Sequence, residues 1–476
     1  MYHSNINSHS YSPQIILGVD IGTSGVRGCI VEVKTDQRVS DRKLTETILV
    51  EHTVPMVFPD KDPASGASTQ DPAVWTHAFE QLFLELAGSV FLKQVTHIVA
   101  DATSSTVLLC DSDGKALTNA LMYDDQQAKE PAKAVQELVT QDGFETAATG
   151  ASSTLAKVLL LRGQLQESKP SLKEAVICHQ IDWFNHWLTG KLAITDENSA
   201  LKLGYDSVNN QWPIWIIDLL ATKSNSTGLV TSLPTVLKPG TPIAAVSHEM
   251  VSRFGLSKST VVHAGTTDSI AGFLASGASK IGDAVSSLGS TLAVKLVSKK
   301  PVFNIDYGIY SHRLGDNWLV GGASNAGGAV LLHFFPLEKI KTLLAELLKP
   351  GCIDRWQPRS LPDYYPLIKA GERFPVADAH LKPKLPVFEK DADHKQQREF
   401  LLAMIQGLTQ IEKLGYQRLE ELGANSVQRL FTVGGGTKNR VWQALRQQHL
   451  NTQFTEPDSL DAAFGVTRLV SQFYKP

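Results

Sequence analysis

Short apolar runs that stop at small, polar turns are the main pattern near the start of the chain. Ile15–Val19 is one such run and Cys29–Val31 is another. The segment between them includes Asp20–Gly25, which reads DIGTSG and is too short and too rich in glycine for a helix. The pattern therefore predicts two buried strands joined as a β-hairpin.

A similar pattern returns in the second half of the chain. Ala284–Val297 predicts a strand, a turn at Leu288–Thr291 and a second strand. Ser287 stands where the first hairpin has Asp20. We interpret the two segments as an internal duplication, in which only the first copy carries an acid. Backbone N–H groups in such turns can converge on an anion, so a pair of them suits a nucleotide triphosphate.

Val261–Gly277 predicts a buried strand, a tight turn at Gly265 and a helix that opens at Asp268. Thr266 and Thr267 are expected to cap that helix. An acid at the end of a strand is placed for chemistry on a ligand above the sheet. The alternative is an ordinary acid that offsets the helix dipole. The other motifs of the chain favour the first interpretation.

Two further junctions carry candidate chemistry. A strand at Leu430–Val433 runs into Gly434–Gly436, followed by a helix with Asn439 in its first turn, a junction that brings backbone close to a ligand. Ser104 and Ser105 follow a strand at Thr96–Ala100, where their hydroxyls suit a sugar, with a simple turn as the alternative.

The remaining apolar patterns predict the other helices and strands of the fold. It predicts helices at Asp71–Ala87, Ser153–Gln164, Glu399–Leu422 and Asp461–Gln472, and a strand running into a helix at Val176–Leu188. Ser40–Ser68 is polar with scattered Pro and Gly, so it predicts an extended loop or lid rim. Lys157 is interpreted as a solvated charge, with a side chain that reaches the cleft as the alternative.

Composition excludes several classes of protein. The 476 residues are 42% hydrophobic and 20% charged, with a net charge of −3, which argues against a nucleic-acid partner. Since there is no long apolar run and no signal peptide, we expect no membrane partner and a cytoplasmic location. The four scattered cysteines indicate reduced thiols. Residues 1–13 are expected to form a disordered tail.

Taken in order, DIGTSG, GTTDS and GGGTKN resemble the motifs of the FGGY family of carbohydrate kinases, from about Ile15 to Phe473. The resemblance implies an α/β, two-domain, actin/hexokinase-like (ribonuclease H-like) fold. Each domain would be a mixed β-sheet flanked by helices, with the active site in the interdomain cleft. The implied domains are residues 14–258, for the sugar and the first phosphate hairpin, and residues 259–476, for ATP, with a hinge near Leu256–Thr260.

Two segments are similar to the pentulose-kinase branch, namely Asp101–Leu109 and Ala120–Asp125. Within that branch they are most similar to plant and cyanobacterial enzymes that act on D-ribulose or were first labelled xylulose kinases. Many members carry a Trp-x-Asp-x-Arg signature, which reads Tyr123, Asp125 and Gln127 here. The loss of the arginine leaves the identity of the sugar open.

The resemblance implies a role for each motif. Asp268 would be the general base, and Asp20 would organise Mg²⁺, in part through water. Both acids would also contact substrate. The other expected sugar contacts are Ser104, Ser105, Asp125 and Asp182. The expected ATP contacts are Gly22, Thr23, Ser24, Thr267, Gly289, Ser290, Thr291, Gly435, Gly436 and Asn439.

The expected function is ATP- and Mg²⁺-dependent phosphorylation of a ketopentose, with D-ribulose giving D-ribulose 5-phosphate. D-Xylulose, glycerol or a hexulose on the same fold is the alternative acceptor. An actin-like nucleotide-binding module is the alternative outside the enzymes, and the sugar-side segments argue against it. The expected partners are a small sugar and ATP, and a homodimer is left open.

Overall fold

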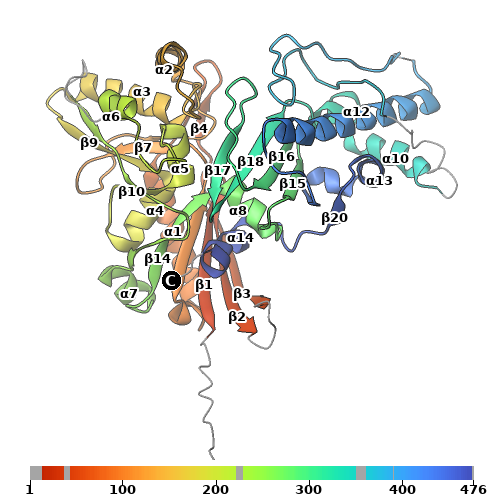
Figure 1. The fold of residues 1–476 in the computed structure, drawn as a ribbon. Helices are drawn as coiled ribbons and strands as arrows, with labels where there is room; N and C mark the ends of the chain where they lie inside the picture. Colours follow the sequence, from red (N-terminus) through yellow and green to blue (C-terminus); the bar gives the residue numbers. More distant parts are fainter. Residues whose placement is uncertain (1–12, 37–42, 221–228, 350–360, 390, 474–476) are drawn as a thin grey trace, which may run out of the picture.

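The computed structural model describes residues 13–36, 43–220, 229–349, 361–389 and 391–473. They form two lobes, with the first half of the chain in one and the second half in the other (Figure 1). Three six-stranded sheets and one two-stranded sheet build the described part of the chain. The predicted tail lies outside the described residues, apart from Pro13.

The first large sheet forms the base of the N-terminal lobe. Its strands, in spatial order, are β13 (Pro242–Ala245), β14 (Val261–Thr267), β6 (His97–Ala102), β1 (Gln14–Ile21), β2 (Gly25–Asp36) and β3 (Lys43–Pro55). The predicted first hairpin is confirmed, because β1 and β2 pair antiparallel from Gln14 with Val33 to Ile21 with Val26.

A second six-stranded sheet completes the N-terminal lobe. Its strands are β11 (Val230–Ser232), β9 (Glu174–His179), β7 (Val107–Cys110), β8 (Ala120–Leu121), β5 (Ala67–Gln70) and β4 (Asp60–Asp62). The strands β10 (Ile194–Asp196) and β12 (Thr235–Leu237) pair separately. The helical segments of this lobe are α1 (Pro72–Ala87), η1 (Leu92–Gln94), α2 (Lys129–Asp142), α3 (Thr154–Ser168), α4 (Gln180–Thr189), α5 (Glu197–Ala200), η2 (Leu201–Leu203), α6 (Ile214–Leu220), α7 (His248–Phe254) and α8 (Asp268–Ala275).

The third large sheet belongs to the C-terminal half. Its strands are β17 (Tyr310–Leu314), β18 (Asn317–Ser324), β16 (Leu292–Ser298), β15 (Asp283–Leu288), β19 (Arg429–Val433) and β20 (Gln453–Thr455). The helical segments of this half are α9 (Gly328–Phe334), α10 (Leu337–Leu347), α12 (His394–Glu421), η3 (Gly435–Lys438), α13 (Arg440–His449), α14 (Ala462–Arg468) and η4 (Leu469–Phe473).

The expected duplication is visible in the strand pairing. In the first sheet β1 pairs antiparallel with β2 and parallel with β6, and in the third sheet β15 pairs antiparallel with β16 and parallel with β19. Asp20 and Ser287 are each the second-to-last residue of their strand. The two hairpins therefore occupy equivalent places in two related sheets.

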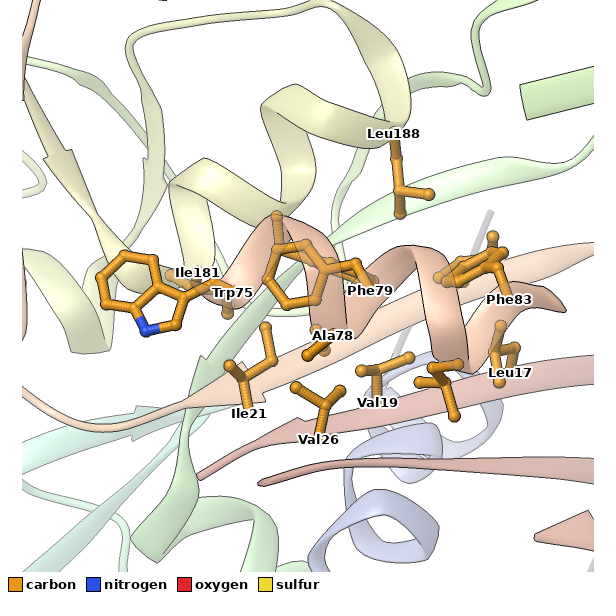
Figure 2. Packing of buried hydrophobic residues seen from close by; sticks show 14 of the residues in the cluster. Leu17, Val19, Ile21, Val26, Trp75, Ala78, Phe79, Phe83, Ile181 and Leu188 are labelled. Carbon is orange, nitrogen blue, oxygen red and sulfur yellow. The ribbon is translucent and has the colours of Figure 1, made fainter. Parts of the chain in front are cut away.

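The helix α1 covers one face of the first sheet because its apolar side chains recur at helical spacing. Asp71 caps its N-terminus by accepting a hydrogen bond from the Ala73 N–H at 2.8 Å. Figure 2 shows aromatic rings of α1, those of Trp75, Phe79 and Phe83, over apolar side chains of β1. This layer holds the first hairpin rigidly against the rest of the lobe.

The helices α8 and α14 form a layer between the first and third sheets. One apolar cluster joins Ile16 of β1, Ile270 of α8, Phe464 of α14, Val285 of β15 and Leu319 of β18. The two halves of the chain thus share one apolar core.

A buried ion pair connects two helices to the central strands of the third sheet. Arg446 of α13 donates two hydrogen bonds to the carboxylate of Glu412 on α12, at 2.7 and 2.8 Å, and neither side chain is exposed to solvent. The hydroxyl of Ser286 on β15 also bonds to Glu412, and the Arg446 guanidinium donates to the Thr432 hydroxyl on β19 at 2.8 Å. Two helices and two central strands are joined at this point.

Two predictions about organisation are wrong. The expected domain break before Val261 falls inside the first sheet, where β14 pairs parallel with β6 and antiparallel with β13. The chain passes to the third sheet only after α8, at Asp283. The expected loop at Ser40–Ser68 is largely strand, since β3 is a long edge strand paired with β2 and β4 pairs with β5.

Candidate active site

Three parallel strands of the first sheet end side by side at the cleft. The strand β6 lies between β1 and β14 and is parallel to both. Asp101 of β6 is paired in register with Asp20 on one side and with Thr266 on the other. Asp268 follows β14 directly as the first residue of α8. Since parallel strands end at one edge, their carboxylates gather there.

Asp101 is the residue that the sequence interpretation missed. It is fully buried, and neither carboxyl oxygen has a hydrogen-bond partner among the described residues. Burial raises the pKa of Asp101 well above its usual range, and the charges of Asp20 and Asp268 and the side-chain contact with Asp20 add to this effect. A buried acid whose neighbouring side-chain group is a second carboxyl is costly for stability, which is typical of a functional site. The only signal in the sequence was its place at the end of a strand.

The two predicted acids lie in different surroundings. Burial raises the pKa of Asp20, and the Arg27 guanidinium of β2 lies 3.8 Å from its carboxylate. Burial also raises the pKa of Asp268, whose carboxylate accepts a hydrogen bond from the Ser269 N–H at 2.6 Å. No other hydrogen bond to Asp268 is found among the described residues, so its carboxylate is available to a ligand.

The threonines before Asp268 do not cap the helix with their side chains. Thr267 is the N-terminal cap residue, but its buried hydroxyl has no hydrogen-bond partner in the described part of the chain. The tight turn predicted at Gly265 is also absent, because Gly265 lies within β14. A Cβ there would stand 1.8 Å from the carbonyl oxygen of Ala100. The glycine is required for close contact between neighbouring strands.

The second hairpin turn has a neighbour that sequence reasoning did not single out. The Gly328 N–H donates to the Gly289 carbonyl at 2.8 Å, and the Ala329 N–H donates to the Ser290 carbonyl at 3.1 Å. The segment that opens α9 therefore packs directly on the expected phosphate turn. Its Gly-Gly pair, Gly327 and Gly328, was the available signal.

The third glycine cluster also packs on the second hairpin. A Cβ at Gly436 would stand 2.6 Å from the Cβ of Leu288, at the end of β15, whereas a Cβ at Gly435 would meet no atom within 4 Å. Asn439 is the cap of α13, not part of its first turn, and its side chain accepts a hydrogen bond from the Trp442 N–H at 3.1 Å. The open side of Gly435 leaves backbone accessible to a ligand.

Ser105 has the features of a binding residue on the sugar side. It is the only buried serine with a left-handed backbone in the described part of the chain, with φ of 65°. Its hydroxyl has no hydrogen-bond partner there. Strained backbone and an unpartnered hydroxyl together favour a ligand contact over a simple turn. Ser104 lies in the same turn and is half-buried.

Lys157 is not a solvated charge as expected. It is fully buried on α3, and its ammonium donates to the carbonyls of Ser105 at 3.1 Å and Met122 at 2.6 Å. Burial lowers its pKa to about 7. The lysine joins the two segments that the resemblance places at the sugar, and thus positions Ser105.

Two expected sugar contacts also have structural roles, although the buried Oδ1 of Asp182 has no hydrogen-bond partner among the described residues. Both oxygens of Asp125 accept hydrogen bonds, from the N–H of Ser68 at 2.7 Å and from the backbone and side chain of Gln127 at 3.0 and 2.8 Å. Asp182 accepts hydrogen bonds from the backbone N–H and ring of His179 at 2.9 and 2.8 Å, which closes the first turn of α4. Their carboxylates hold the loop and the helix in place.

No cluster of three or more His, Cys, Asp or Glu side chains with metal-binding geometry is found in the described part of the chain. Mg²⁺ usually keeps several waters and takes only one or two carboxylates from a protein. Asp20 and the unpartnered Asp101 beside it supply those two. The donor set therefore fits Mg²⁺ and does not fit a fully protein-bound metal.

The free energy of unfolding of an Asp101→Asn variant tests whether the buried carboxyl destabilises the folded protein. A raised folded pKa means that the folded protein binds a proton that the unfolded chain releases above about pH 4. Stability is therefore lost as the pH rises through that window, by about 1.4 kcal/mol per pH unit. Because asparagine does not titrate, we expect Asp101→Asn to be more stable than the wild type at neutral pH, by a margin that grows with pH until the folded pKa is passed.

Urea unfolding from about pH 5 to about pH 9 measures this margin. Asp196→Asn is the matched control. Burial raises the pKa of Asp196 to about 7, but its carboxylate accepts hydrogen bonds from the backbone of Asn198 and Ser199. That variant is expected to gain less stability, because the hydrogen bonds stabilise the ionised form of Asp196. An Asp101→Asn protein no more stable than wild type at every pH would show that the buried acid is not strained.

The described residues include no helix with the length and apolar content that a membrane span requires.

Known proteins match nearly the whole chain. The FGGY family of carbohydrate kinases matches through its N-terminal domain at residues 15–275 and through its C-terminal domain at residues 284–466. The limits of these matches agree with the observed passage between sheets after α8.

Individual relatives share this organisation. A xylulose kinase from Bacillus subtilis is 23% identical, over 92% of this chain and 84% of that protein. A gluconokinase from the same organism is 21% identical, over 94% and 85%. A solved structure described as a xyloylose kinase from Brucella ovis superposes with a TM-score of 0.75 at 20% identity, covering 96% of this chain and 90% of that one. The chain belongs to the FGGY family of carbohydrate kinases and is an ATP-dependent sugar kinase.

Proposed function

We propose that the protein phosphorylates a ketopentose, with D-ribulose as the substrate and D-ribulose 5-phosphate as the product. The observation that carries the proposal is the set of unpartnered polar groups at the strand ends: the Asp101 carboxyl and the hydroxyls of Thr267 and Ser105. Buried polar groups normally have partners, so a set of three without partners indicates a polar ligand. The choice of D-ribulose rests on the resemblance of Asp101–Leu109 and Ala120–Asp125.

Asp268 is the proposed general base. A sugar hydroxyl keeps its proton at neutral pH, so a carboxylate must accept that proton as the new P–O bond forms. This role is supported by the position of Asp268 directly after β14 and by its carboxylate, whose hydrogen bond among the described residues is the one from the Ser269 N–H. Its raised pKa makes it a stronger base than an exposed aspartate.

The two hairpin turns are the proposed phosphate sites. Gly22, Thr23 and Ser24 lie at the first turn, and Gly289, Ser290 and Thr291 lie at the second. Their backbone N–H groups and hydroxyls are donors of the kind that phosphates accept. Gly435, Gly436 and Asn439 are the proposed contacts to the adenosine end. Asp20 and Asp101 would hold Mg²⁺, which when bound neutralises charge on the phosphates.

D-Xylulose is the second candidate substrate, and a specific finding favours it. The xylulose kinase of Bacillus subtilis aligns over 92% of this chain. D-Ribulose and D-xylulose differ only in the configuration of one hydroxyl. A site that satisfies one buried hydroxyl can separate such epimers by ~1–3 kcal/mol, which corresponds to a preference of roughly 5- to 150-fold.

Initial rates of ADP release with a sugar panel test the assignment. We expect kcat/KM for D-ribulose to exceed that for D-xylulose at least about tenfold, and glycerol, gluconate and an aldohexose to be poorer still. Reactions without sugar measure background ATP hydrolysis. A higher kcat/KM for D-xylulose would reverse the choice between epimers. A higher value for glycerol, gluconate or an aldohexose would overturn the ketopentose assignment.

A further inference from the structure

A cavity of about 550 Å³ lies among the helices α1, α4 and α7 of the N-terminal lobe, and the proposed reaction does not use it. The helix α4 contributes Trp183, His186 and Trp187 to its lining, α1 contributes Thr76, and the start of α7 contributes residues 247–249. We call it the α4 cavity. Its size is that of a small-molecule site.

The α4 cavity is on the opposite face of the first sheet from α8. The side chains of Leu17 and Val19 on β1 pack in one apolar cluster with α1, α4 and α7, whereas Ile16 packs with α8 and α14. Since alternate residues of a strand point to opposite faces, the two groups of helices cover the sheet from opposite sides. None of the described residues proposed to contact sugar, ATP or Mg²⁺ lines this cavity. A ligand bound here is therefore separate from the active site.

The surrounding core holds the two indole rings in fixed positions. Trp187 packs against Phe83 and Phe254, with ring centres 5.2 and 5.9 Å apart. The indole N–H of Trp183 donates to the Thr76 hydroxyl at 3.0 Å. Both tryptophans are only half-buried. Because they are four residues apart, they lie on one face of α4, about 6 Å apart along its axis. The cavity thus has a preformed aromatic surface.

Polar groups with unused hydrogen-bonding capacity lie beside the indoles. The buried Nδ1 of His186 has no hydrogen-bond partner among the described residues. Gly114 leaves room for the imidazole, because a Cβ on Gly114 would stand 2.2 Å from the His186 Nε2. The Ser247 hydroxyl accepts a hydrogen bond from the Met250 N–H at 3.4 Å, and its own proton finds no acceptor in the described part of the chain. Since a buried polar atom normally has a partner, the Nδ1 of His186 indicates a polar ligand.

The charges around the α4 cavity are balanced. Its described lining contains no lysine or arginine that could hold a phosphate. Its one carboxylate, that of Glu249, is paired with the Arg253 guanidinium at 2.7 Å. Neither an anion nor a cation is therefore matched by an unpaired lysine, arginine or carboxylate. Aromatic carbon beside hydrogen-bonding groups suits a neutral sugar, whose C–H face contacts the ring while its hydroxyls donate and accept hydrogen bonds.

We propose that the α4 cavity binds a neutral disaccharide, with one sugar ring against each indole. Two indoles, and a volume larger than one sugar ring needs, favour two rings over one. The hydroxyls of the disaccharide bond to the Nδ1 of His186 and to the Ser247 hydroxyl. This site takes no part in phosphate transfer, and it does not depend on which sugar the enzyme phosphorylates.

Calorimetric titration of the intact protein with maltose, cellobiose and sucrose tests the proposal. We expect at least one of them to bind the wild type, and D-glucose to bind more weakly because it covers only one indole. Trp183→Leu should weaken disaccharide binding about fivefold to tenfold, whereas Trp183→Phe keeps an aromatic ring and should retain most of it. Trp212→Leu is the matched control, since Trp212 is also half-buried and donates its indole N–H, to the Pro234 carbonyl at 3.1 Å, but does not line the cavity.

Variants of His186 supply a second readout. An asparagine places an amide atom where the Nδ1 of His186 stands, so His186→Asn should bind the disaccharide better than His186→Leu. Urea unfolding of each variant shows whether it is folded. The best substrate of the rate panel should leave disaccharide binding in place, because the two sites lie on opposite faces of the first sheet.

Absence of binding by all three disaccharides would overturn the proposal. Equal affinity in the wild type, Trp183→Leu and His186→Leu, with both variants folded, would also overturn it. Displacement by the best substrate would place the disaccharide in the cleft instead. Tighter binding of tetramethylammonium or adenine, with the same dependence on Trp183, would assign the cavity to a cation or to a flat base. Failure of D-ribulose in the rate panel changes none of these results, so the two proposals can fail separately.

Discussion

Asp268→Asn is expected to lower sugar-dependent turnover by ~10²–10⁴-fold, because the variant cannot accept the proton of the sugar hydroxyl. Asparagine has nearly the same size, and its side-chain oxygen can still accept the hydrogen bond from Ser269. The helix α8 should therefore form as before. Binding of sugar and of an ATP analogue should change little, since the loss lies in the chemical step.

The pH dependence supplies a second readout of the same role. Asp268 must be ionised to act as a base, so activity of the wild type should fall as the pH falls through its raised pKa. The residual activity of Asp268→Asn should lack that acid limb. Lys295, Lys202, Asp20 and Asp101 all lie close enough to influence this pKa, by their effect on Asp268 or by its effect on them.

Asp71→Asn is the control for the substitution itself. Asp71 also lies at the start of a helix and also accepts a backbone hydrogen bond, but it is exposed and belongs to α1, on a face of the first sheet away from the α8 layer. We expect its kcat to stay near that of the wild type. If Asp268→Asn binds sugar and keeps more than about a tenth of wild-type turnover, another group accepts the proton.

Arg446→Met is expected to have the largest effect on stability. Removing one partner of a buried ion pair leaves the other charge unpaired in the interior, which costs ~3–5 kcal/mol. Here the remaining charge would be the fully buried carboxylate of Glu412. The strands β15 and β19 carry the second hairpin and the glycine cluster, so weaker binding of an ATP analogue is expected as well.

Urea unfolding compares Arg446→Met with Arg253→Met. Arg253 pairs with Glu80 and Glu249 at 2.9 and 2.7 Å, but this pair is exposed, so its loss should cost less than about 1 kcal/mol. The double variant Glu412→Leu with Arg446→Met leaves no unpaired charge and should recover part of the loss. Equal losses in Arg446→Met and Arg253→Met would show that the buried pair does not stabilise the third sheet.

Several features of this protein could be predicted from short stretches of sequence. Both hairpins, the strand that leads to Asp268 and the glycine turn before Asn439 depend on local apolar runs and on glycine conformations. Their order was enough for the resemblance to sugar kinases. The relation of Ser287 to Asp20 is local in the same sense, and the structure confirms it.

Other features depend on contacts between distant segments, and no local pattern contains them. The strand β14 belongs to the first sheet because it pairs with β6, about 160 residues earlier. Asp101 meets Asp20 and Asp268 only because three parallel strands end together. Asp125 and Asp182 satisfy neighbouring N–H groups, which a residue type alone does not reveal.

The chain by itself thus determined the local elements, the family and the two acids of the proposed chemistry, because these follow from short-range backbone preferences and motif order. Only the tertiary structure decided which polar groups are left without partners and which side chains line a cavity. Burial and pairing are set by segments far apart in sequence, and a buried carboxyl or a strained serine becomes evidence only when those segments meet.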